Sequence, residues 1–134
     1  MLDTEVLFAA DPKDRHHDKA LKLFASRTDI VAPDTALLEF AEVLKTMGVP
    51  PPGVRRFVLA LDRALSEQGV RQGRTICAQL LARQCELETR IGMTYFDSLI
   101  AASALALDGT VVSDDKAFDD VPGLRRIPLG QQAQ

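Results

Sequence analysis

The sequence predicts an α/β fold with a small, mostly parallel central sheet flanked by helices. Short apolar runs suited to buried strands alternate with longer segments whose apolar residues recur at helical spacing. The strand-like runs are the first residues (MLD), 29–32 (DIVA), 110–113 (TVVS) and 124–128 (LRRIP). A chain of 134 residues can bury one core, so we expect a single domain over residues 1–130 and a short polar tail over 131–134.

The composition is that of an ordinary soluble globular protein, with 46% hydrophobic and 26% charged residues. No apolar run approaches the roughly 20 residues that span a membrane, and no basic segment leads into an apolar stretch near the N-terminus. We therefore expect a cytoplasmic protein with no membrane partner. The net charge of −3 gives no overall basic field for nucleic acid, which leaves only a local basic patch for that purpose.

The first part of the chain is expected to alternate strands and helices. MLDTEVLFAA reads as a very short strand, then Asp3, then a helical turn. Asp14 can cap a helix to about Ser26, and Pro33 can open the next one, because its missing N–H would be unpaired there anyway. The apolar sides of these two helices are Ala20, Leu21, Leu23 and Phe24, and Leu37, Leu38, Ala41 and Leu44. Glu39 lies on a flank of the second stripe.

The second part of the chain contains three further helical segments. GVPPPG breaks the chain before a helix over about 54–68, and a loop (GVRQGR, 69–74) precedes a helix over about 75–87. Gly92 ends that segment, and Thr94 starts TYFDSLIAASALAL. The last helix should pack closely through its small residues, which are Ala101, Ala102, Ser103 and Ala104.

Two cysteines, Cys77 and Cys85, fall in the same predicted helix. Their separation corresponds to a rise of about 12 Å, which is too far for a disulfide. We interpret both as small buried apolar residues, since free cysteine is among the most buried residue types. With no other cysteine, and with His16 and His17 far away in sequence, no zinc site is expected.

Four carboxylates from separate segments are expected to meet at one edge of the sheet. A turn at 108–109 (DG) joins a helix of about 20 Å to a strand that runs back beside it, so Asp97 and Asp115 can lie at the same end. That end is the carboxyl edge of the sheet, where open α/β folds place their sites. Asp3 ends the first strand there, and Glu39 lies within side-chain reach.

Carboxylates at close range repel and raise one another's pKa, and a divalent cation removes this conflict. Oxygen-only ligands favour Mg²⁺ or Mn²⁺ over zinc or copper. One ion, or two about 4 Å apart, can activate a water and stabilise the oxygens of a phosphodiester during in-line displacement. In a chain with 19 acidic residues this spacing is a weak signal by itself, and it yields the hypothesis of metal-dependent phosphodiester hydrolysis.

Several stretches of the chain occur together in a characteristic order. They are MLDTEVLFAA, PDTALLEFAEVL, MTYFDSLIAASALALDGTVVSDDKAFDDV and PGLRRIPL. These stretches resemble the motifs of PIN-domain ribonucleases, especially the VapC-like toxins of prokaryotic toxin–antitoxin pairs. The most specific part spans 94–129, where Ser113-x-Asp115-x-x-Phe118 follows a small-residue helix, a turn and a strand. The middle, from about 48 to 90, matches only in helical character.

The resemblance implies a role for each of the four acids, which in chain order are Asp3, Glu39, Asp97 and Asp115. Asp3, Asp97 and Asp115 resemble the metal-holding acids of the family, and Glu39 resembles the acid that positions or deprotonates the attacking water. Thr4 and Ser113 resemble the small hydroxyl residues that orient these acids. The resemblance further implies a PIN-like α/β fold, Mg²⁺ or Mn²⁺ as cofactor, RNA as substrate, a homodimer, and a cognate antitoxin protein whose segment lies across the cleft.

Three positions depart from the family's pattern. Only Met1 and Leu2 precede Asp3, whereas the family usually has a longer first strand. Glu5 stands where an asparagine is common, and Asp114 stands where a basic or neutral residue is common. Whether Glu5 or Asp114 joins the site is left open by the sequence.

Other functions are compatible with the same residues. One is a PIN-type RNA-processing nuclease outside toxin–antitoxin systems, and another is a degenerate PIN domain that only binds RNA or a protein. Arg71 and Arg74 read as solvated loop charges or as contacts to RNA phosphates, and Glu42 as a solvent-facing residue. A phosphoacceptor receiver domain is discounted, because it would carry its acidic pair early in the chain.

Overall fold

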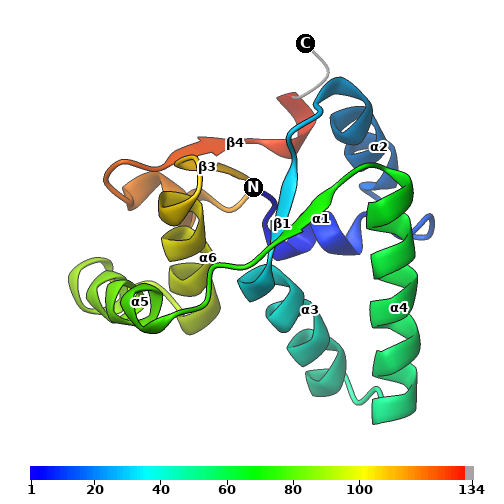
Figure 1. The fold of residues 1–134 in the computed structure, drawn as a ribbon, viewed down its shortest axis with the longest axis horizontal. Helices are drawn as coiled ribbons and strands as arrows, with labels where there is room; N and C mark the ends of the chain where they lie inside the picture. Colours follow the sequence, from blue (N-terminus) through cyan, green and yellow to red (C-terminus); the bar gives the residue numbers. More distant parts are fainter. Residues whose placement is uncertain (132–134) are drawn as a thin grey trace.

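Short parallel strands form the centre of the fold in the computed structural model, which describes residues 1–131 (Figure 1). The strands are β1 (Val31–Pro33), β2 (Arg71–Gly73), β3 (Thr110–Val112) and β4 (Arg125–Ile127). Around them lie the helices α1 (Thr4–Phe8), α2 (His17–Ser26), α3 (Asp34–Thr46), α4 (Pro51–Glu67), α5 (Ala78–Ile91) and α6 (Tyr95–Ala106), with the 3₁₀ helices η1 (Lys116–Asp120) and η2 (Leu129–Gln131). The predicted α/β class is confirmed. Of the tail expected at 131–134, Gln131 is the last residue of η2, and residues 132–134 lie outside the described residues.

The first residues of the chain join two pairs of parallel strands. β1 pairs with β2, and β3 pairs with β4. Between these pairs, Leu2 forms a parallel bridge with Val112, and the Leu2 amide donates to the carbonyl of Val31 over 2.9 Å. The very short strand predicted for the first residues is reduced to this single bridge. Because it is parallel to β3, it delivers Asp3 to the carboxyl edge of the sheet.

Helix α6 packs closely against its neighbours, as its composition predicts. It contacts α5, α3 and β3, and its small residues are all buried: Ala101, Ala102, Ser103 and Ala104. Short side chains let the backbones of neighbouring elements approach, so the start of α6 is held firmly at the carboxyl edge. Across residues 1–131, none of the helices has the length and apolar character that crossing a membrane requires.

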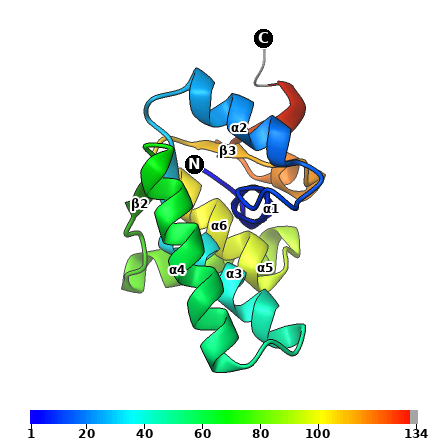
Figure 2. The same ribbon diagram turned by 90° about the vertical axis from the view of Figure 1, so that its right-hand side faces the viewer.

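Helices α3 and α4 form a hairpin whose tip points away from the strands (Figures 1 and 2). The buried face of α3 consists of Thr35, Ala36, Phe40 and Leu44. Leu38, expected on the apolar stripe, is 48% exposed, and Leu21 of α2 is likewise exposed. Both predictions were wrong because each helix has more apolar residues than one face needs, and the packing of neighbouring elements decides which of them is covered.

Residues 71–73 form a strand where the sequence predicts a loop over 69–74. The amide of Arg71 donates to the carbonyl of Ile30 over 3.1 Å, and β2 then pairs with β1 along its length. The side chains of Arg71 and Gln72 are exposed, so this strand shows no apolar alternation. It is defined by backbone pairing alone, which a hydrophobic pattern does not reveal.

Several helix starts differ from the expected positions. Asp14 accepts a hydrogen bond from the amide of His16 (2.8 Å) within a turn, and α2 begins only at His17. Pro33 ends β1 and is also the N-cap residue of α3, which begins at Asp34. Helix α4 begins at Pro51, earlier than expected, since proline fits the first turn of a helix, where no intrahelical N–H is needed.

Helix α5 also differs from the prediction, both in its limits and in its cysteines. It runs from Ala78 to Ile91, and Gly92 ends it with a φ of +75°, a left-handed conformation that favours glycine. Cys77 and Cys85 are both exposed, contrary to the expectation that they are buried. They lie away from the face that packs inward, which is formed by Leu80, Gln84 and Leu87.

Asp34 ties the start of α3 to the segment between β2 and α5. Its carboxylate accepts hydrogen bonds from the amides of Thr35 (3.0 Å), Thr75 (2.8 Å) and Ile76 (3.0 Å) and from the Thr75 hydroxyl (2.6 Å). Burial acts to raise the pKa of Asp34, but these hydrogen bonds outweigh it and hold the pKa below its ordinary value. The Thr75 hydroxyl also contacts that of Ser103 over 2.8 Å, which extends the connection to α6.

We expect Asp34→Ala to lower the free energy of unfolding by about 2 kcal/mol or more, because buried donors lose a charged acceptor. Urea unfolding followed by circular dichroism measures the change. Asp18→Ala, which removes an exposed acid from the first turn of α2, is the matched control and should be near neutral. Equal stability of the two variants would contradict the role of Asp34.

Candidate active site

Asp3 is the most buried of the clustered acids, with 6% of its surface exposed. One carboxylate oxygen accepts from the amide of Thr4 (2.7 Å), so Asp3 also caps α1. The other oxygen accepts from the hydroxyl of Ser113 (2.6 Å). Burial raises the pKa of Asp3 to about 7, and the charges of Glu5 and Asp97 act in the same direction. The neighbourhood of Asp3 therefore disfavours its negative charge as long as no cation is present.

Glu39 reaches the same edge from α3. The hydroxyl of Thr4 donates to its carboxylate, which links Glu39 to the residue that follows Asp3. Burial raises the pKa of Glu39, and the charges of Asp97 and Asp115 raise it further. A raised pKa makes the Glu39 carboxylate a stronger base than an ordinary exposed glutamate.

Asp97 lies in the first turn of α6, where its amide donates to the hydroxyl of the N-cap residue Thr94 over 3.4 Å. Burial raises the pKa of its carboxyl, and the charges of Asp115 and Glu5 add to the effect. The carboxylate of Asp97 is thus close enough to both residues to be affected by their charges.

Asp115 follows β3 and caps η1. Its carboxylate accepts from the amide of Ala117 (2.9 Å), and its own amide donates to the Ser113 hydroxyl (3.0 Å). The negative charge of Asp115 acts on Glu39 and Asp97. Asp115 is exposed, so this side of the cluster is open to solvent.

The four predicted acids therefore lie at one place, supplied by α1, α3, α6 and the end of β3. Thr4 and Ser113 each hold one of them by a hydrogen bond, at Glu39 and Asp3 respectively. Carboxylate oxygens are the donors that Mg²⁺ and Mn²⁺ prefer, so the chemistry of the set fits such an ion. Over residues 1–131, no three acidic, histidine or cysteine side chains stand in a geometry that already encloses a metal. Binding of an ion would need the carboxylates to draw together.

Asp114 is placed outside the cluster by its contacts. Its carboxylate accepts from the amide of Leu129 over 2.9 Å and so anchors the start of η2. Arg126 of β4 holds the same turn, because its guanidinium donates to the carbonyl of Ser113 (3.1 Å) and pairs with Asp119 (2.8 Å). The sequence did not indicate Arg126 as a functional residue. The one signal was that Arg126 alternates with the buried Ile127 in β4, which places its side chain toward this turn.

The remaining candidates lie elsewhere. The His17 ring contacts the carbonyl of Ala9 over 2.9 Å. Glu42 is exposed, as predicted. Arg71 and Arg74 are also exposed, and no contact links them to the acids among the described residues.

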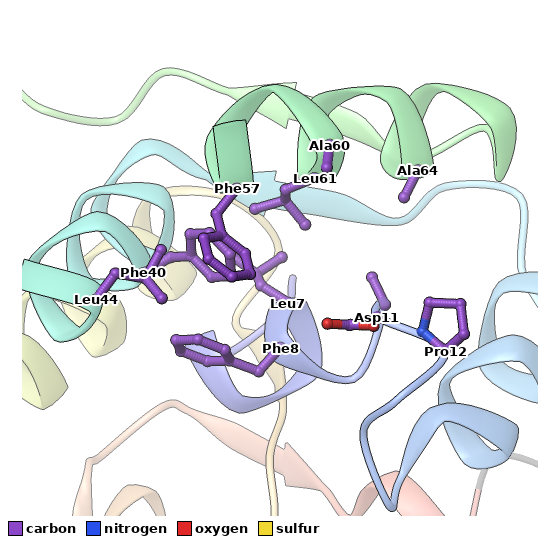
Figure 3. A pocket seen from close by; sticks show the side chains of 11 residues that line it. Leu7, Phe8, Asp11, Pro12, Phe40, Leu44, Phe57, Ala60, Leu61 and Ala64 are labelled. Carbon is purple, nitrogen blue, oxygen red and sulfur yellow. The ribbon is translucent and has the colours of Figure 1, made fainter. Parts of the chain in front are cut away.

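An apolar groove lies between α4 on one side and α1 and α3 on the other (Figure 3). Its volume is about 240 Å³, and its aromatic lining comprises Phe8, Phe40 and Phe57. The rings of Phe8 and Phe40 are tilted by 34° against each other with their centroids 4.5 Å apart, and Phe57 is 46% exposed. Helices α1 and α3, which line one side of the groove, also carry Thr4 and Glu39.

Two solved structures are similar to this chain over nearly its whole length. VapBC2 from Rickettsia felis, solved with a DNA fragment from its promoter, gives a TM-score of 0.69 at 22% identity, over 96% of each chain. VapC20 from Mycobacterium tuberculosis, a toxin that cleaves the sarcin–ricin loop, gives a TM-score of 0.67 at 18% identity, over 88% of this chain and 91% of the other. At these identities the likeness establishes the fold. No curated protein matches the chain.

The family model of the PIN domain matches residues 1–124. The match covers the segments that carry all four acids and agrees with the resemblance seen in the motifs. PIN domains are generally divalent-metal-dependent nucleases. The chain belongs to the PIN domain family.

Proposed function

We propose that this protein is an endoribonuclease that hydrolyses RNA phosphodiester bonds with Mg²⁺ or Mn²⁺, as the VapC-like toxin of a toxin–antitoxin pair. The observation that carries the proposal is the meeting of Asp3, Glu39, Asp97 and Asp115, three of which have raised pKa values. A cluster of carboxylates whose ionisation is disfavoured is stabilised by a bound cation. The cation then offsets the negative charge of a phosphodiester. The proposal places the enzyme in the cytoplasm, with its RNA.

Asp3, Asp97 and Asp115 would hold the metal, directly or through water. The ion would supply positive charge beside the scissile phosphate and lower the pKa of a water. The Ser113 hydroxyl fixes the orientation of Asp3 from one side, and the Thr4 amide fixes it from the other. Both contacts fix the carboxylate in advance, which reduces the reorganisation needed for binding.

Glu39 is the residue proposed to accept the proton of the attacking water. As the water oxygen bonds to phosphorus, its proton passes to Glu39, the bond from phosphorus to the leaving ribose oxygen breaks, and that oxygen takes a proton from solvent. The raised pKa of Glu39 makes its carboxylate a better base than an exposed one. The hydroxyl of Thr4 keeps one oxygen of Glu39 occupied and leaves the other for the water.

The apolar groove is the proposed docking surface for part of the antitoxin. It is lined in part by α1 and α3, the helices that carry Thr4 and Glu39, and it exposes Phe57 to solvent, so a partner seated there would cover apolar surface. We further propose that the active form is a homodimer, which sedimentation can test.

A non-catalytic PIN domain that only binds RNA is the second candidate. It is favoured by the open arrangement of the acids, which within residues 1–131 does not enclose a metal site. A third reading, a PIN nuclease for RNA processing, shares the chemistry proposed above and differs only in lacking an antitoxin. Metal titration separates the second candidate from the other two, and the genomic neighbourhood separates the toxin from the processing enzyme.

Asp97→Asn should keep the fold and lower the rate of RNA cleavage by at least about a hundredfold, since it removes a charged oxygen at the reacting end of the site. Cleavage of a fluorescent RNA in Mn²⁺ measures the loss, and circular dichroism checks the fold. Asp18→Asn, which changes an exposed acid in the first turn of α2, should cleave as the wild type does. Undiminished cleavage by folded Asp97→Asn protein would refute the role.

Metal-free protein should lose stability as pH rises, because of Asp3. Its folded-state pKa of about 7 lies above the unfolded value of about 3.9. Between these values the folded state binds more protons than the unfolded state, so rising pH favours unfolding. In EDTA at pH 8, Asp3→Asn should melt several degrees above the wild type, and near pH 4 the two should converge.

Adding Mn²⁺ at pH 8 should reverse this order, because the ion stabilises wild-type protein and has lost a ligand in Asp3→Asn. Asp120→Asn, an exposed acid in η1, should follow the wild type throughout. Melting curves that show no pH-dependent difference between Asp3→Asn and wild type, and no response to Mn²⁺, would contradict this account of Asp3.

Phe57→Asp should abolish inhibition by the antitoxin without slowing RNA cleavage, because it puts a charge in the apolar groove on α4, a helix that carries none of the four acids. The test is co-purification and inhibition with the cognate antitoxin. Val58→Asp alters a neighbouring exposed residue of α4 that does not line the groove, and it should be inhibited normally. Normal inhibition of both variants would place the antitoxin on another surface.

A further inference from the structure

Glu5 is an exposed residue in the first turn of α1 whose carboxylate is nevertheless held in place. One of its oxygens, Oε1, accepts a hydrogen bond from the Ser113 hydroxyl (3.1 Å) and another from the amide of Asp114. Both donors belong to the turn that leaves β3 and carries Asp115. Glu5 therefore links the start of α1 to this turn across more than a hundred residues of sequence.

The Ser113 hydroxyl takes part in three of the hydrogen bonds that hold this turn. It accepts from the amide of Asp115 (3.0 Å), and its single proton lies within reach of Asp3 (2.6 Å) and of Glu5 (3.1 Å). A hydroxyl has one proton to donate, so the two carboxylates share it. The direction of this hydroxyl fixes Asp3 and the backbone of Asp115 together.

The rest of the turn is restrained from the opposite side. Arg126 donates to the carbonyl of Ser113, and the carboxylate of Asp114 accepts from Leu129. These contacts fix the carbonyl and a side chain of the turn, whereas the amide of Asp114 is held by Glu5. Without Glu5 the amide of Asp114 would lose its acceptor, and from the α1 side the turn would keep only the contact of the Ser113 hydroxyl with Asp3.

We propose that Glu5 is a positioning residue that clamps the Ser113–Asp114 turn through Oε1 and so keeps Asp115 aimed at the other acids. The inference rests on the proposed nuclease function. Both groups that Glu5 contacts are donors, so the role requires an acceptor oxygen rather than a negative charge. A glutamine side chain has the same length and offers such an oxygen, whereas alanine does not.

Two variants separate this role from direct metal binding. With Mn²⁺ alone in isothermal titration calorimetry, Glu5→Ala should raise the dissociation constant about tenfold, the size typical of lost outer contacts to metal ligands. Glu5→Gln should bind Mn²⁺ nearly as the wild type does. Glu42→Ala, an exposed acid on α3, controls for the loss of one negative charge. Hydrogen exchange of the Asp114 amide, measured by NMR without metal, should be about tenfold faster in Glu5→Ala and unchanged in Glu5→Gln.

The outcomes distinguish the clamp from its rivals. If Glu5→Gln weakens Mn²⁺ binding as much as Glu5→Ala, the charge is what matters and the positioning role is overturned. An unchanged dissociation constant in Glu5→Ala would overturn it equally. The exchange measurement needs no metal and therefore tests the clamp by itself. If exchange is faster in Glu5→Ala but the wild type neither binds Mn²⁺ nor cleaves RNA, the clamp stands and the nuclease function is refuted. Glu5 would then have no catalytic purpose.

Discussion

Repulsion among carboxylates gathered at the carboxyl edge of the sheet is the constraint on which the rest of the site depends. Asp3 is nearly fully buried, and Glu39 and Asp97 are partly buried within range of other negative charges. Without a cation this arrangement costs free energy, because burial and like charges both disfavour ionisation. A fold that keeps such a cluster gains from it only when positive charge arrives, which is why the proposed chemistry uses a hard divalent ion.

The architecture maintains this cluster with short, well-anchored elements. A single parallel bridge between Leu2 and Val112 is enough to deliver Asp3, because α1 begins directly after it and is capped by the same carboxylate. The closely packed α6 holds Asp97 in its first turn. The turn after β3 is fixed by Ser113, whose hydroxyl contacts two carboxylates and an amide. Side chains distant in sequence are thus held by contacts that reach across the sheet edge.

The sequence predicted the fold class, the small-residue packing of α6 and the place where the acids meet, because these depend on strand direction and helix spacing. It did not predict β2, which is defined by backbone pairing, nor the exposure of Leu38 and Cys85, which depends on which helix face neighbouring elements cover. The contacts of Glu5 also could not be read from local pattern, since its partners lie at the far end of the chain.

The most direct measurement of the central claim is a crystal structure of the protein grown with Mn²⁺, with anomalous diffraction recorded to locate the ion. The account predicts an anomalous peak among the carboxylates of Asp3, Asp97 and Asp115, with these side chains drawn together around it. Crystals grown in millimolar Mn²⁺ that show the ion elsewhere, or show none at this edge of the sheet, would contradict it.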